Sequence, residues 1–531
     1  MRADRRSLLK GGIAAAGVMA LPGCETPPVG SSGGADMALG HRLRDGDFPA
    51  PVREERVPVL IAGGGVAGLS AGWRLRDAGY DDFRLIELES QTGGNARGGR
   101  NPVSAYPLGA HYLPIPNEEA RGLRHMLRQL GMIVGDRDGQ PVYDPLQLCA
   151  DLQERLLWQG KWQEGLVPKS GLSPKDKADL TAFETAMAGF SRRRDAQGRP
   201  AFALPIAYSA RDADLMALDR ISFAQWLDRQ GWTSPVLRAH VRYACRDDYG
   251  TEPGEVSAWA GIHYFAGRRG FAADGTGDNE LTWPEGNGRL SRLMTQALGE
   301  RVATGQVAFR ARPAGEGAIV DVFDAARGDT IRYRADTVIL AMPHFIASRL
   351  LGEPSGTDHS YAPWLIANVT VDRAPGGKGS GLAWDNVSAT SASLGYVVAT
   401  HQSASREGPT VLTWYMALSD MPPAAARRLL LERSDADWRR IVRDDLLTMN
   451  PDLDGAIRSV DLWKWGHAMI RPTPNYIWQV AAGQRAAARP PFLRAHSDMS
   501  GLSLFEEAHY QGMVAAEAAL SLIGHDFETL L

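Results

Sequence analysis

The stretch "RVPVLIAGGGVAGLSAGWRLRDAGYDDFRLIELESQTGG", residues 56–94, decides the fold class. It opens with a short apolar run rich in β-branched residues, 57–62, which is typical of a buried strand. Glycines in G-x-G-x-x-G spacing follow, and the small residues after them predict a helix that ends near Gly79. A second strand, 83–88, carries Glu87. This order of strand, glycines, helix, strand and acid predicts a Rossmann-like dinucleotide-binding unit.

Each glycine of the motif has a physical role. Gly63 permits the tight turn from strand to helix, and Gly65 leaves the backbone open to a pyrophosphate. Gly68 lets the helix pack closely on the strand, and Ala67 beside it opens the small-residue helix whose free N–H groups attract phosphate. Glu87, 19 residues after Gly68, is placed to accept hydrogen bonds from an adenosine ribose. The alternative is a tight turn that holds no nucleotide.

The residues after Glu87 resemble the flavin amine oxidase superfamily, which includes monoamine and polyamine oxidases, phytoene desaturases and protoporphyrinogen oxidase. "ESQTGGNARGGR" places Gly93 and Gly94 six and seven residues beyond Glu87. In that superfamily an acid, a short linker and a Gly-Gly pair carry the chain past the FAD pyrophosphate. The resemblance implies FAD as the cofactor, with Arg97 in the same site.

Two further stretches continue the resemblance. "YPLGAHYL", residues 106–113, is similar to the segment that runs beside the flavin, which implies that Gly109 and Ala110 contact the cofactor. His111 either touches the isoalloxazine or is a structural histidine. "RVATGQVAFRARP" places Val307 on a strand where the backbone of the family contacts adenine.

The closing stretch "FLRAHSDMSGLSLFEEAHYQGMVAAEAAL" resembles the last flavin motif of the superfamily. Asp498 stands where the family has an acid, and Glu506 and Ala508 match its Glu-Gly-Ala, although Glu507 replaces the glycine. The resemblance implies that all four residues belong to the cofactor site. A helix beginning near Glu506 would direct its positive dipole end at the flavin ring.

The matching segments lie at both ends and in the middle of the chain. The implied fold is therefore α/β, with a Rossmann-like FAD-binding domain of amine oxidase type interrupted by an α+β substrate domain. Residues 222–231 predict one helix of that domain, capped by Ser222, and 364–371 predict one of its strands. We expect these boundaries: a signal peptide at 1–24, a flexible linker at 25–55, the FAD domain at 56–115, 281–350 and 466–525, and the substrate domain at 116–280 and 351–465.

An aromatic stretch in the second half is the candidate substrate pocket. Flavin oxidation of an amine requires a neutral nitrogen and a C–H aimed at flavin N5, in a site that excludes water. "DLWKWGHAMIRPTPNYIW" offers Trp463, Trp465, His467 and Tyr476, and alternation along a strand puts the two tryptophans on one face. Core packing is the alternative for each of these residues.

The reaction that the resemblance implies is hydride transfer from a C–H next to an amine nitrogen to flavin N5, with reoxidation by oxygen or another acceptor. Two departures leave this open. Asn368 stands where the family often has a lysine, and Leu504 stands where it has an aromatic residue. An FAD-dependent desaturase or isomerase of an apolar lipid, similar to phytoene desaturases, and a non-catalytic flavoprotein remain as alternatives.

The N-terminus "DRRSLLKGGIAAAG", with Arg5 and Arg6, resembles a twin-arginine export signal. It implies the twin-arginine machinery as a partner and a periplasmic or extracytoplasmic location. "LPGC" makes Cys24 a candidate lipid anchor, and a soluble protein cut near this point is the alternative. A net charge of −4 gives no electrostatic reason to expect nucleic acid, and no paired His/Cys cluster predicts a metal. The expected partner is a small-molecule substrate, an amine or an apolar lipid.

Overall fold

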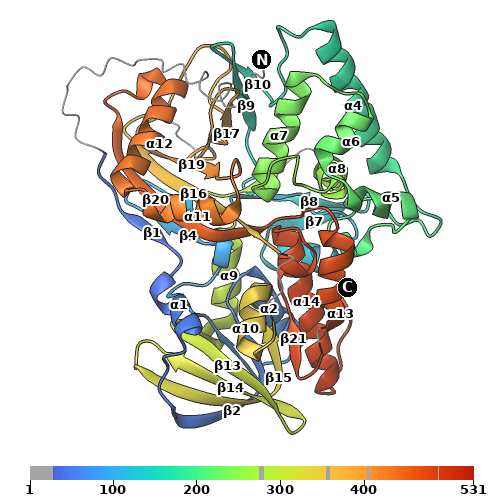
Figure 1. Cartoon of the computed structure of the whole chain (residues 1–531), viewed down its shortest axis with the longest axis vertical. Helices are drawn as coiled ribbons and strands as arrows, with labels where there is room; N and C mark the ends of the chain where they lie inside the picture. Colours follow the sequence, from blue (N-terminus) through green and yellow to red (C-terminus); the bar gives the residue numbers. More distant parts are fainter. Residues whose placement is uncertain (1–27, 274–279, 355–358, 404–406, 488) are drawn as a thin grey trace, which may run out of the picture.

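The computed structural model describes residues 28–273, 280–354, 359–403, 407–487 and 489–531, and in these residues two large sheets stand one above the other (Figure 1). The lower sheet has the strand order β12-β3-β2-β15-β14-β13, and β21 also pairs with β15. Its strands are β2 (Pro51–Ala62), β3 (Phe83–Ile86), β12 (Val302–Ala303), β13 (Gln306–Ala314), β14 (Gly317–Asp324), β15 (Asp329–Leu340) and β21 (Phe492–Arg494).

The centre of the lower sheet is the predicted Rossmann-like unit. Strand β2 runs parallel to both of its neighbours, so that Ile61 stands opposite Leu85 of β3 and Ile339 of β15. All three side chains are buried in one apolar core, and Leu60 on the opposite face is buried in a second core with Val320 and Leu350. Both faces of the strand are therefore covered, which is why it reads as a continuous apolar run. Helix α2 (Val66–Asp77) links β2 to β3 and packs against α9 (Gly288–Leu298) and α14 (Phe505–Leu522). The predicted fold class is confirmed.

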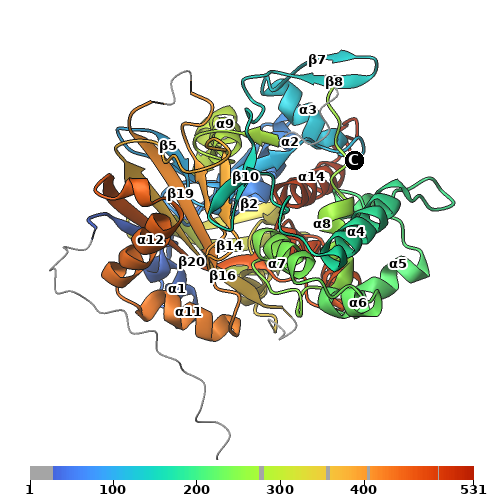
Figure 2. The same ribbon diagram turned by 90° about the horizontal axis from the view of Figure 1, so that it is seen from above.

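The upper sheet has the order β1-β20-β16-β19-β18-β17-β9-β10 and contains the strands expected for the substrate domain. Helices α4 to α8 gather on one side of it and α11 and α12 on the other (Figure 2). The strands are β1 (Ser32–Gly34), β9 (Glu154–Trp158), β10 (Lys161–Glu164), β16 (Tyr361–Val371), β17 (Asp385–Ser388), β18 (Tyr396–Val398), β19 (Thr410–Ala417) and β20 (Ile457–Ile470). The helices are α4 (Pro174–Arg192), α5 (Ala213–Ala217), α6 (Phe223–Arg229), α7 (Pro235–Tyr249), α8 (Ala258–Ala266), α11 (Pro423–Glu432) and α12 (Asp435–Met449).

Three two-stranded ribbons and four further α-helices complete the described residues. They are β4 (Gly98–Arg100) with β5 (Ala105–Pro107), β6 (Tyr112–Pro114) with β11 (Glu280–Thr282), β7 (Ile133–Arg137) with β8 (Gln140–Tyr143), and α1 (Met37–Asp45), α3 (Arg121–Gln129), α10 (His344–Leu351) and α13 (Ala481–Ala487).

Local signals place several of these elements correctly. Ser222 caps α6 with a reciprocal capping box, because its side chain accepts from Gln225 N and the Gln225 side chain accepts from Ser222 N. The predicted strand at 364–371 is the end of β16, and its residues are all buried between neighbouring strands and helices. The predicted helix near Glu506 begins at Phe505 as α14.

The predicted boundaries need three corrections. The linker expected at 25–55 is ordered from Pro28 onward into β1, α1 and the start of β2. The substrate domain is expected to begin at 116 and so to include α3, but Leu123 and Leu127 of α3 pack in one apolar core with α2 and α14. The FAD domain is expected to include 466–525, but β20 crosses the 465/466 boundary and continues to Ile470 as a strand of the upper sheet.

Arg5, Arg6 and Cys24, which carry the predictions of export and lipid attachment, lie outside the described residues. Within the described part of the chain, no helix has the length and apolar character needed to span a membrane. The same residues contain no cluster of three or more His, Cys, Asp or Glu suited to a metal ion.

Candidate functional site: a dinucleotide cavity and an adjoining acidic pocket

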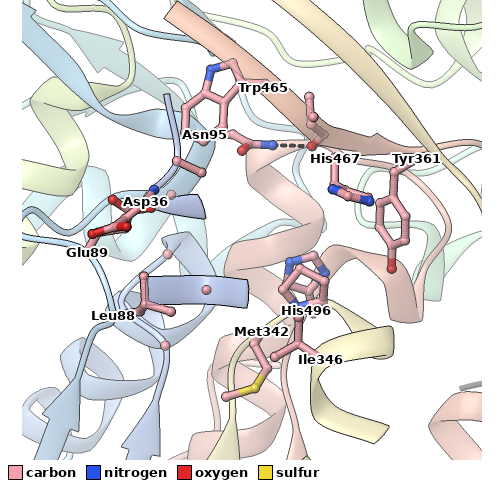
Figure 3. A pocket seen from close by; sticks show the side chains of 18 of the residues that line it. Asp36, Leu88, Glu89, Asn95, Met342, Ile346, Tyr361, Trp465, His467 and His496 are labelled. Atoms are coloured by element: carbon pink, nitrogen blue, oxygen red, sulfur yellow. Dashed lines mark hydrogen bonds between the residues drawn. The ribbon is translucent and has the colours of Figure 1, made fainter. Parts of the chain in front are cut away.

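A cavity of about 790 Å³ opens where β2, β3 and β15 end (Figure 3). Ligands of open α/β sheets bind at the carboxyl ends of the strands, and this volume lies in the usual range for cofactor sites. The predicted cofactor residues that line this cavity are Gly63, Gly65, Ala67, Glu87, Gly93, Gly94, Arg97, Ala110, Val307, Asp498 and Ala508.

The motif glycines create the space for a ligand. Gly63 has a φ of +113°, and a Cβ there would lie 2.2 Å from Ala341 O. A Cβ at Gly68 would lie 1.9 Å from Gly63 O, so only glycine allows this approach of helix and strand. A Cβ at Gly65 would meet nothing nearer than Gly94 Cα at 4.0 Å. The space beside Gly65 therefore belongs to the cavity.

Glu87 is fixed at the cavity wall by backbone donors. Gly64 N donates to Oε2 at 2.5 Å, and Glu89 N donates to Oε1 at 2.9 Å. Burial raises the pKa of Glu87, although these two hydrogen bonds oppose the rise. The carboxylate is thus oriented before any ligand arrives.

Arg97 links the cavity to the aromatic stretch. Its guanidinium forms an ion pair with Glu89 at 3.2 Å and lies over the rings of Trp465 and Trp463, at 4.9 and 5.3 Å from their centroids. The side chain is only 4% exposed, so the charge is held by these contacts rather than by water.

The closing motif divides between two cavities. Asp498 Oδ2 accepts from His344 N at 2.8 Å and from Tyr361 Oη. Burial alone would raise the pKa of Asp498, but the charge and hydrogen bond of His496 together with these donors outweigh it and lower the pKa. The anion is therefore favoured at the floor of the larger cavity.

Glu506 and Glu507 point in different directions. Glu506 lines a second, smaller cavity, whereas Glu507 lines neither of the two and accepts from Ile206 N at 2.6 Å. Burial raises the pKa of each to about 7. The predicted cofactor role of Glu507 is not supported, because its carboxyl is turned toward the helical part of the molecule.

The smaller cavity, about 130 Å³, shares a wall with the larger one through Asn95, Ala110, Trp465 and Phe505. Its volume is close to that of a cavity that accepts benzene. Trp364 and Tyr415 line one side, with ring planes 14° apart and centroids separated by 6.5 Å. The pocket has the size of a small organic group and an aromatic wall.

Carboxyl groups outnumber cations in this pocket. Asp247, Asp248 and Glu506 line it together with one guanidinium, Arg268. Arg268 donates to Asp248 Oδ1 at 2.6 Å, and Asp248 Oδ2 has no hydrogen-bond partner although the residue is 4% exposed. A buried acceptor without a donor is costly, so the pocket is suited to a ligand that donates.

Burial changes the proton affinity of these acids. The pKa of Asp247 is raised to about 7 by burial first and by the charge of Asp248 second. Asp385 lies behind the pocket, where it accepts from Tyr243 Oη at 3.0 Å and Tyr415 Oη at 3.2 Å, and burial raises its pKa as well. A cationic ligand would favour the ionised forms of these acids.

His111 faces the same pocket as a neutral base. Nδ1 lies 3.1 Å from Gly109 O, and since a carbonyl oxygen only accepts, Nδ1 carries the proton and Nε2 is left as an acceptor. Burial lowers the pKa of His111 to about 4. Of the two alternatives left open by the sequence, contact with the site is the one the pocket favours. Gly109 lines the pocket beside it.

The predicted aromatic stretch is only partly in the site. Trp465 lines both cavities and donates from Nε1 to Leu108 O at 2.6 Å, and His467 lines the larger one. Trp463 shares the face of Trp465, with ring centroids 5.9 Å apart, but lines neither cavity. Tyr476 is buried away from both, against Gly501. Of the four predicted pocket residues, Trp463, which is half-buried against Gly33 and Arg97, and Tyr476, which is buried, therefore lie outside both cavities.

The two departures from the family pattern also have structural positions. Asn368 lies inside β16, where Nδ2 donates to Pro107 O at 3.1 Å and Oδ1 accepts from Thr413 Oγ1 at 2.7 Å. It lines neither cavity. Leu504 and the adjacent Phe505 both line the junction of the two cavities. Asn368 is therefore a structural residue.

The residues of the larger cavity fit FAD. The open space at Gly65 accepts a pyrophosphate beside the N-terminus of α2, and Glu87 stands ready for a ribose hydroxyl. The helix α14 begins at the junction of the two cavities, where Phe505 lines both. A flavin ring at this end would border the smaller pocket.

The comparisons with known proteins agree with this geometry. Residues 61–130 match the family model of an NAD(P)-binding Rossmann-like domain. A Baeyer-Villiger monooxygenase of Streptomyces coelicolor is 37% identical over 91 residues, which is 16% of this chain and only 15% of that protein's length.

Solved structures match over most of the chain. A redesigned putrescine oxidase has a TM-score of 0.64 at 17% identity, covering 89% of this chain and 100% of its own. Cyclohexylamine oxidase from Brevibacterium oxydans has a TM-score of 0.63 at 15% identity, covering 88% and 99%. The fold is that of the flavin-dependent amine oxidases. A fatty acid isomerase from P. acnes shares it at a TM-score of 0.57 and 14% identity, covering 87% and 98%.

The sequence indicated His111, Trp465 and Glu506 but not the other side chains that shape the smaller pocket. Asp247 and Asp248 are adjacent charges on α7, a pattern that usually indicates an exposed face. Trp364 and Tyr415 lie inside strands that read as buried core. The one usable signal was the run "RYACRDDYG", in which two acids stand directly before a tyrosine and the helix-ending Gly250.

Proposed function

We propose that the protein is an FAD-dependent oxidoreductase of the amine oxidase type that oxidises a small primary or secondary amine. The proposed reaction removes a hydride from the C–H next to the nitrogen and a proton from the nitrogen itself, which leaves an imine. The chemistry that bound FAD supplies is acceptance of this hydride at N5, with later transfer of the electrons to oxygen or another acceptor.

The observation that supports an amine is the character of the smaller pocket. Asp248 Oδ2 is buried without a donor, Asp247 stands beside it, and Arg268 is the one cation among the residues that line the pocket. An ammonium group supplies the missing N–H donors and the opposite charge. The aromatic faces of Trp364 and Tyr415 add a surface that attracts cations.

The reaction also requires the amine to be neutral when its C–H bond breaks. Neutral His111 presents Nε2 to the pocket as an acceptor, and its pKa of about 4 keeps it unprotonated at neutral pH. The carboxyl of Asp247, with a pKa of about 7, exchanges protons in the same range. We assign binding of the ammonium to Asp247 and Asp248 and orientation of the neutral nitrogen to His111.

An apolar lipid fits this pocket less well. The pocket has a volume of about 130 Å³ and is lined by three carboxyl groups. A hydrocarbon chain in it would remove water from these carboxyl groups without supplying hydrogen-bond donors in its place. Extraction of the purified protein separates the two possibilities. A stoichiometric fatty acid or polyene in the extract would favour the desaturase or isomerase reaction over amine oxidation.

The activity test uses the purified yellow protein with a panel of amines in air. We expect at least one small amine to give hydrogen peroxide or reduce an added dye, with formation of the matching aldehyde. Amines that lack a hydrogen on the carbon next to nitrogen are the matched controls and should give no product. If no amine turns over while the flavin is reduced chemically, a non-catalytic flavoprotein is the better description.

We further propose that the protein is exported by the twin-arginine route to the periplasm and that Cys24 is a candidate lipid anchor. The supporting observation is the order of the N-terminal signal together with a cofactor site assembled from residues 63 to 508, which exists only in the folded chain. Replacing Arg5 and Arg6 by lysine should leave a yellow, folded protein in the cytoplasm. A colourless, unfolded product there would contradict the link between export and cofactor.

A further inference from the structure

Residues 28–47, which we call the strap, run across the larger cavity from one sheet to the other. The strap begins at β1, on the edge of the upper sheet beside β20, and its helix α1 reaches β13 of the lower sheet (Figure 1). Ten of its residues, between Ser32 and Arg44, line the cavity. The segment that directly follows the predicted signal is therefore a wall of the dinucleotide site.

The upper end of the strap is attached through its backbone. Strand β1 pairs in parallel with β20, and Ser31 donates from N and Oγ to Asp461 Oδ1 at 2.7 and 2.8 Å. Arg439 of α12 donates to Gly30 O at 2.8 Å and to Ser31 O at 3.0 Å. These contacts define the position of the strap beside the upper sheet.

Glycines make this attachment possible. A Cβ at Gly30 would lie 2.0 Å from Val460 O, and one at Gly34 would lie 2.7 Å from Lys464 O. Both obstacles are backbone atoms, so no change of rotamer relieves them. The glycine-rich composition, which normally indicates a flexible linker, here allows two backbones to approach closely.

The middle of the strap meets the ribose-binding side of the cavity. Asp36 and Glu89 lie next to each other at the edge of the cavity (Figure 3), where Asp36 N donates to Glu89 Oε1 at 2.9 Å. Glu89 also pairs with Arg97. Asp36 Oδ1 accepts from Leu39 N at 2.9 Å and thereby caps α1. The start of α1 is thus held beside Glu87, the residue placed to bind ribose.

The lower end of the strap is attached by an arginine. Arg42 lies over the rings of Phe48 and Phe323, at 4.6 and 4.3 Å from their centroids, and donates to Asp47 O at 2.6 Å. Phe48 stacks on Phe309 of β13 with a centroid distance of 4.2 Å. The strap therefore bridges the cavity between two fixed ends.

Helix α1 itself has little to pack against. None of its nine residues is buried, and Met37 is 48% exposed, yet five of them line the cavity. A helix this short is marginal without tertiary packing. A ligand in the cavity would supply the missing surface, and stabilising the closed strap would in turn slow the loss of the ligand.

From this arrangement we infer that the strap is a retaining element for the adenosine end of a dinucleotide cofactor, closing over it after it binds. The inference rests on the proposed identification of that cofactor as FAD. Two consequences follow. Bound FAD protects the strap from proteolysis, and loosening the ends of the strap speeds the release of FAD without changing the site itself.

The test compares full-length holoprotein variants by the rate of flavin release after dilution, followed by flavin fluorescence. The loosening variants are Gly30→Ala and Arg439→Ala, at two residues that hold the upper end of the strap and do not line the cavity. The matched controls are Gly189→Ala, an open position on α4, and Arg440→Ala, an exposed neighbour on α12 that pairs with Asp437. We expect release about 10-fold faster in the loosening variants and unchanged in the controls.

Two further readouts make the outcome decisive. Hydrogen exchange at the amides of 31–34 reports whether the strap has detached, and trypsin cleavage after Arg42 and Arg44 in wild-type protein with and without FAD reports protection. Fast exchange with release rates equal to the controls, or equal cleavage with and without FAD, would overturn the inference. A protein that neither contains nor takes up flavin would instead overturn the proposed cofactor and the strap's role with it.

Discussion

The larger cavity and the smaller pocket share a wall but are built in different ways. The cavity is shaped by backbone: Gly63 at a φ of +113°, Gly65 with open space beside it, and Glu87 held by two N–H groups. The pocket is shaped by single side chains on separate elements, including Asp247 of α7 and Tyr415 of β19. Backbone geometry thus shapes the space in the cavity, whereas side chains from separate elements supply the charges and aromatic faces of the pocket.

The largest effect is expected on FAD binding, and it should differ between two glycines of the same motif. Gly65→Val places a side chain in open space, so the protein should fold but bind FAD about 100-fold more weakly. Gly63→Ala should instead lower the free energy of unfolding, because it combines a positive φ with a clash against Ala341 O. Flavin titration and urea unfolding of both variants check this. A fully yellow Gly65→Val protein would contradict the placement of the cofactor.

The next prediction concerns the pocket alone. Asp247→Asn should leave flavin content unchanged and weaken amine binding about 10-fold, because a charge-assisted contact to the ammonium is lost. In the wild type, amine affinity should rise as pH increases through about 7, since Asp247 ionises there, and this rise should be absent in the variant. Steady-state KM and kcat between pH 6 and 8 measure it. Asp336→Asn, an exposed carboxylate of the lower sheet, is the control.

A smaller effect tests whether Glu507 belongs to the buried interior and not to the ligand site. Glu507 has a pKa of about 7 in the folded protein because it is buried, against an ordinary value of 4.5. The folded state therefore holds its proton between these values, and wild-type stability is lost as pH rises through that window. Glu507→Gln cannot ionise. The amount by which its free energy of unfolding exceeds that of the wild type should therefore be about 2–3 kcal/mol larger at pH 8 than at pH 5.

Urea unfolding at the two pH values, at a fixed concentration of FAD, measures this difference. The half-exposed Glu55→Gln provides the control at the opposite end of the molecule. A difference between Glu507→Gln and wild type that stays constant with pH would show that the carboxyl reaches water, and the assignment of Glu507 to the buried interior would be wrong.

The smallest effect is expected at an aromatic residue that the sequence placed in the pocket. Tyr476→Phe removes a hydroxyl that donates to Asp498 O at only 3.4 Å and lines neither cavity, so stability should change by less than about 0.5 kcal/mol. Its flavin spectrum should match the wild type. Trp465→Phe, which alters the shared wall, should shift the flavin absorbance. If the flavin absorbance of Tyr476→Phe shifts as much as that of Trp465→Phe, Tyr476 belongs to the site after all.

The cofactor half of this comparison could be predicted from sequence, and the reason is physical. Gly63, Gly65 and Gly68 lie within six positions of one another, and their spacing follows from local turn and packing geometry. The pocket residues have no such local rule, because Asp247 and Tyr415 come together only when α7 packs against the upper sheet. Alternation along the strand correctly predicted that Trp463 and Trp465 share one face, but only Trp465 lines the pocket.

The strap, in contrast, is a segment for which the sequence predicts flexibility and the structure shows a fixed position. Its Gly- and Ser-rich composition predicts a flexible linker. Glycine, however, has two effects: it makes a chain flexible, and it also lets two backbones approach closely. Composition cannot distinguish these uses. Only the partner strand β20, more than four hundred residues later in the chain, shows which one applies.

The most direct test of the central claim, that an amine is oxidised in the acidic pocket beside bound flavin, is an anaerobic titration of the yellow protein with a small amine. One equivalent of amine per flavin should bleach the oxidised spectrum and yield one equivalent of aldehyde after hydrolysis of the imine. In Asp247→Asn the end point should stay at one equivalent, while the amine concentration that gives half the maximal rate of bleaching should rise about 10-fold. A flavin that stays oxidised with every amine tried, although dithionite reduces it, would contradict the account.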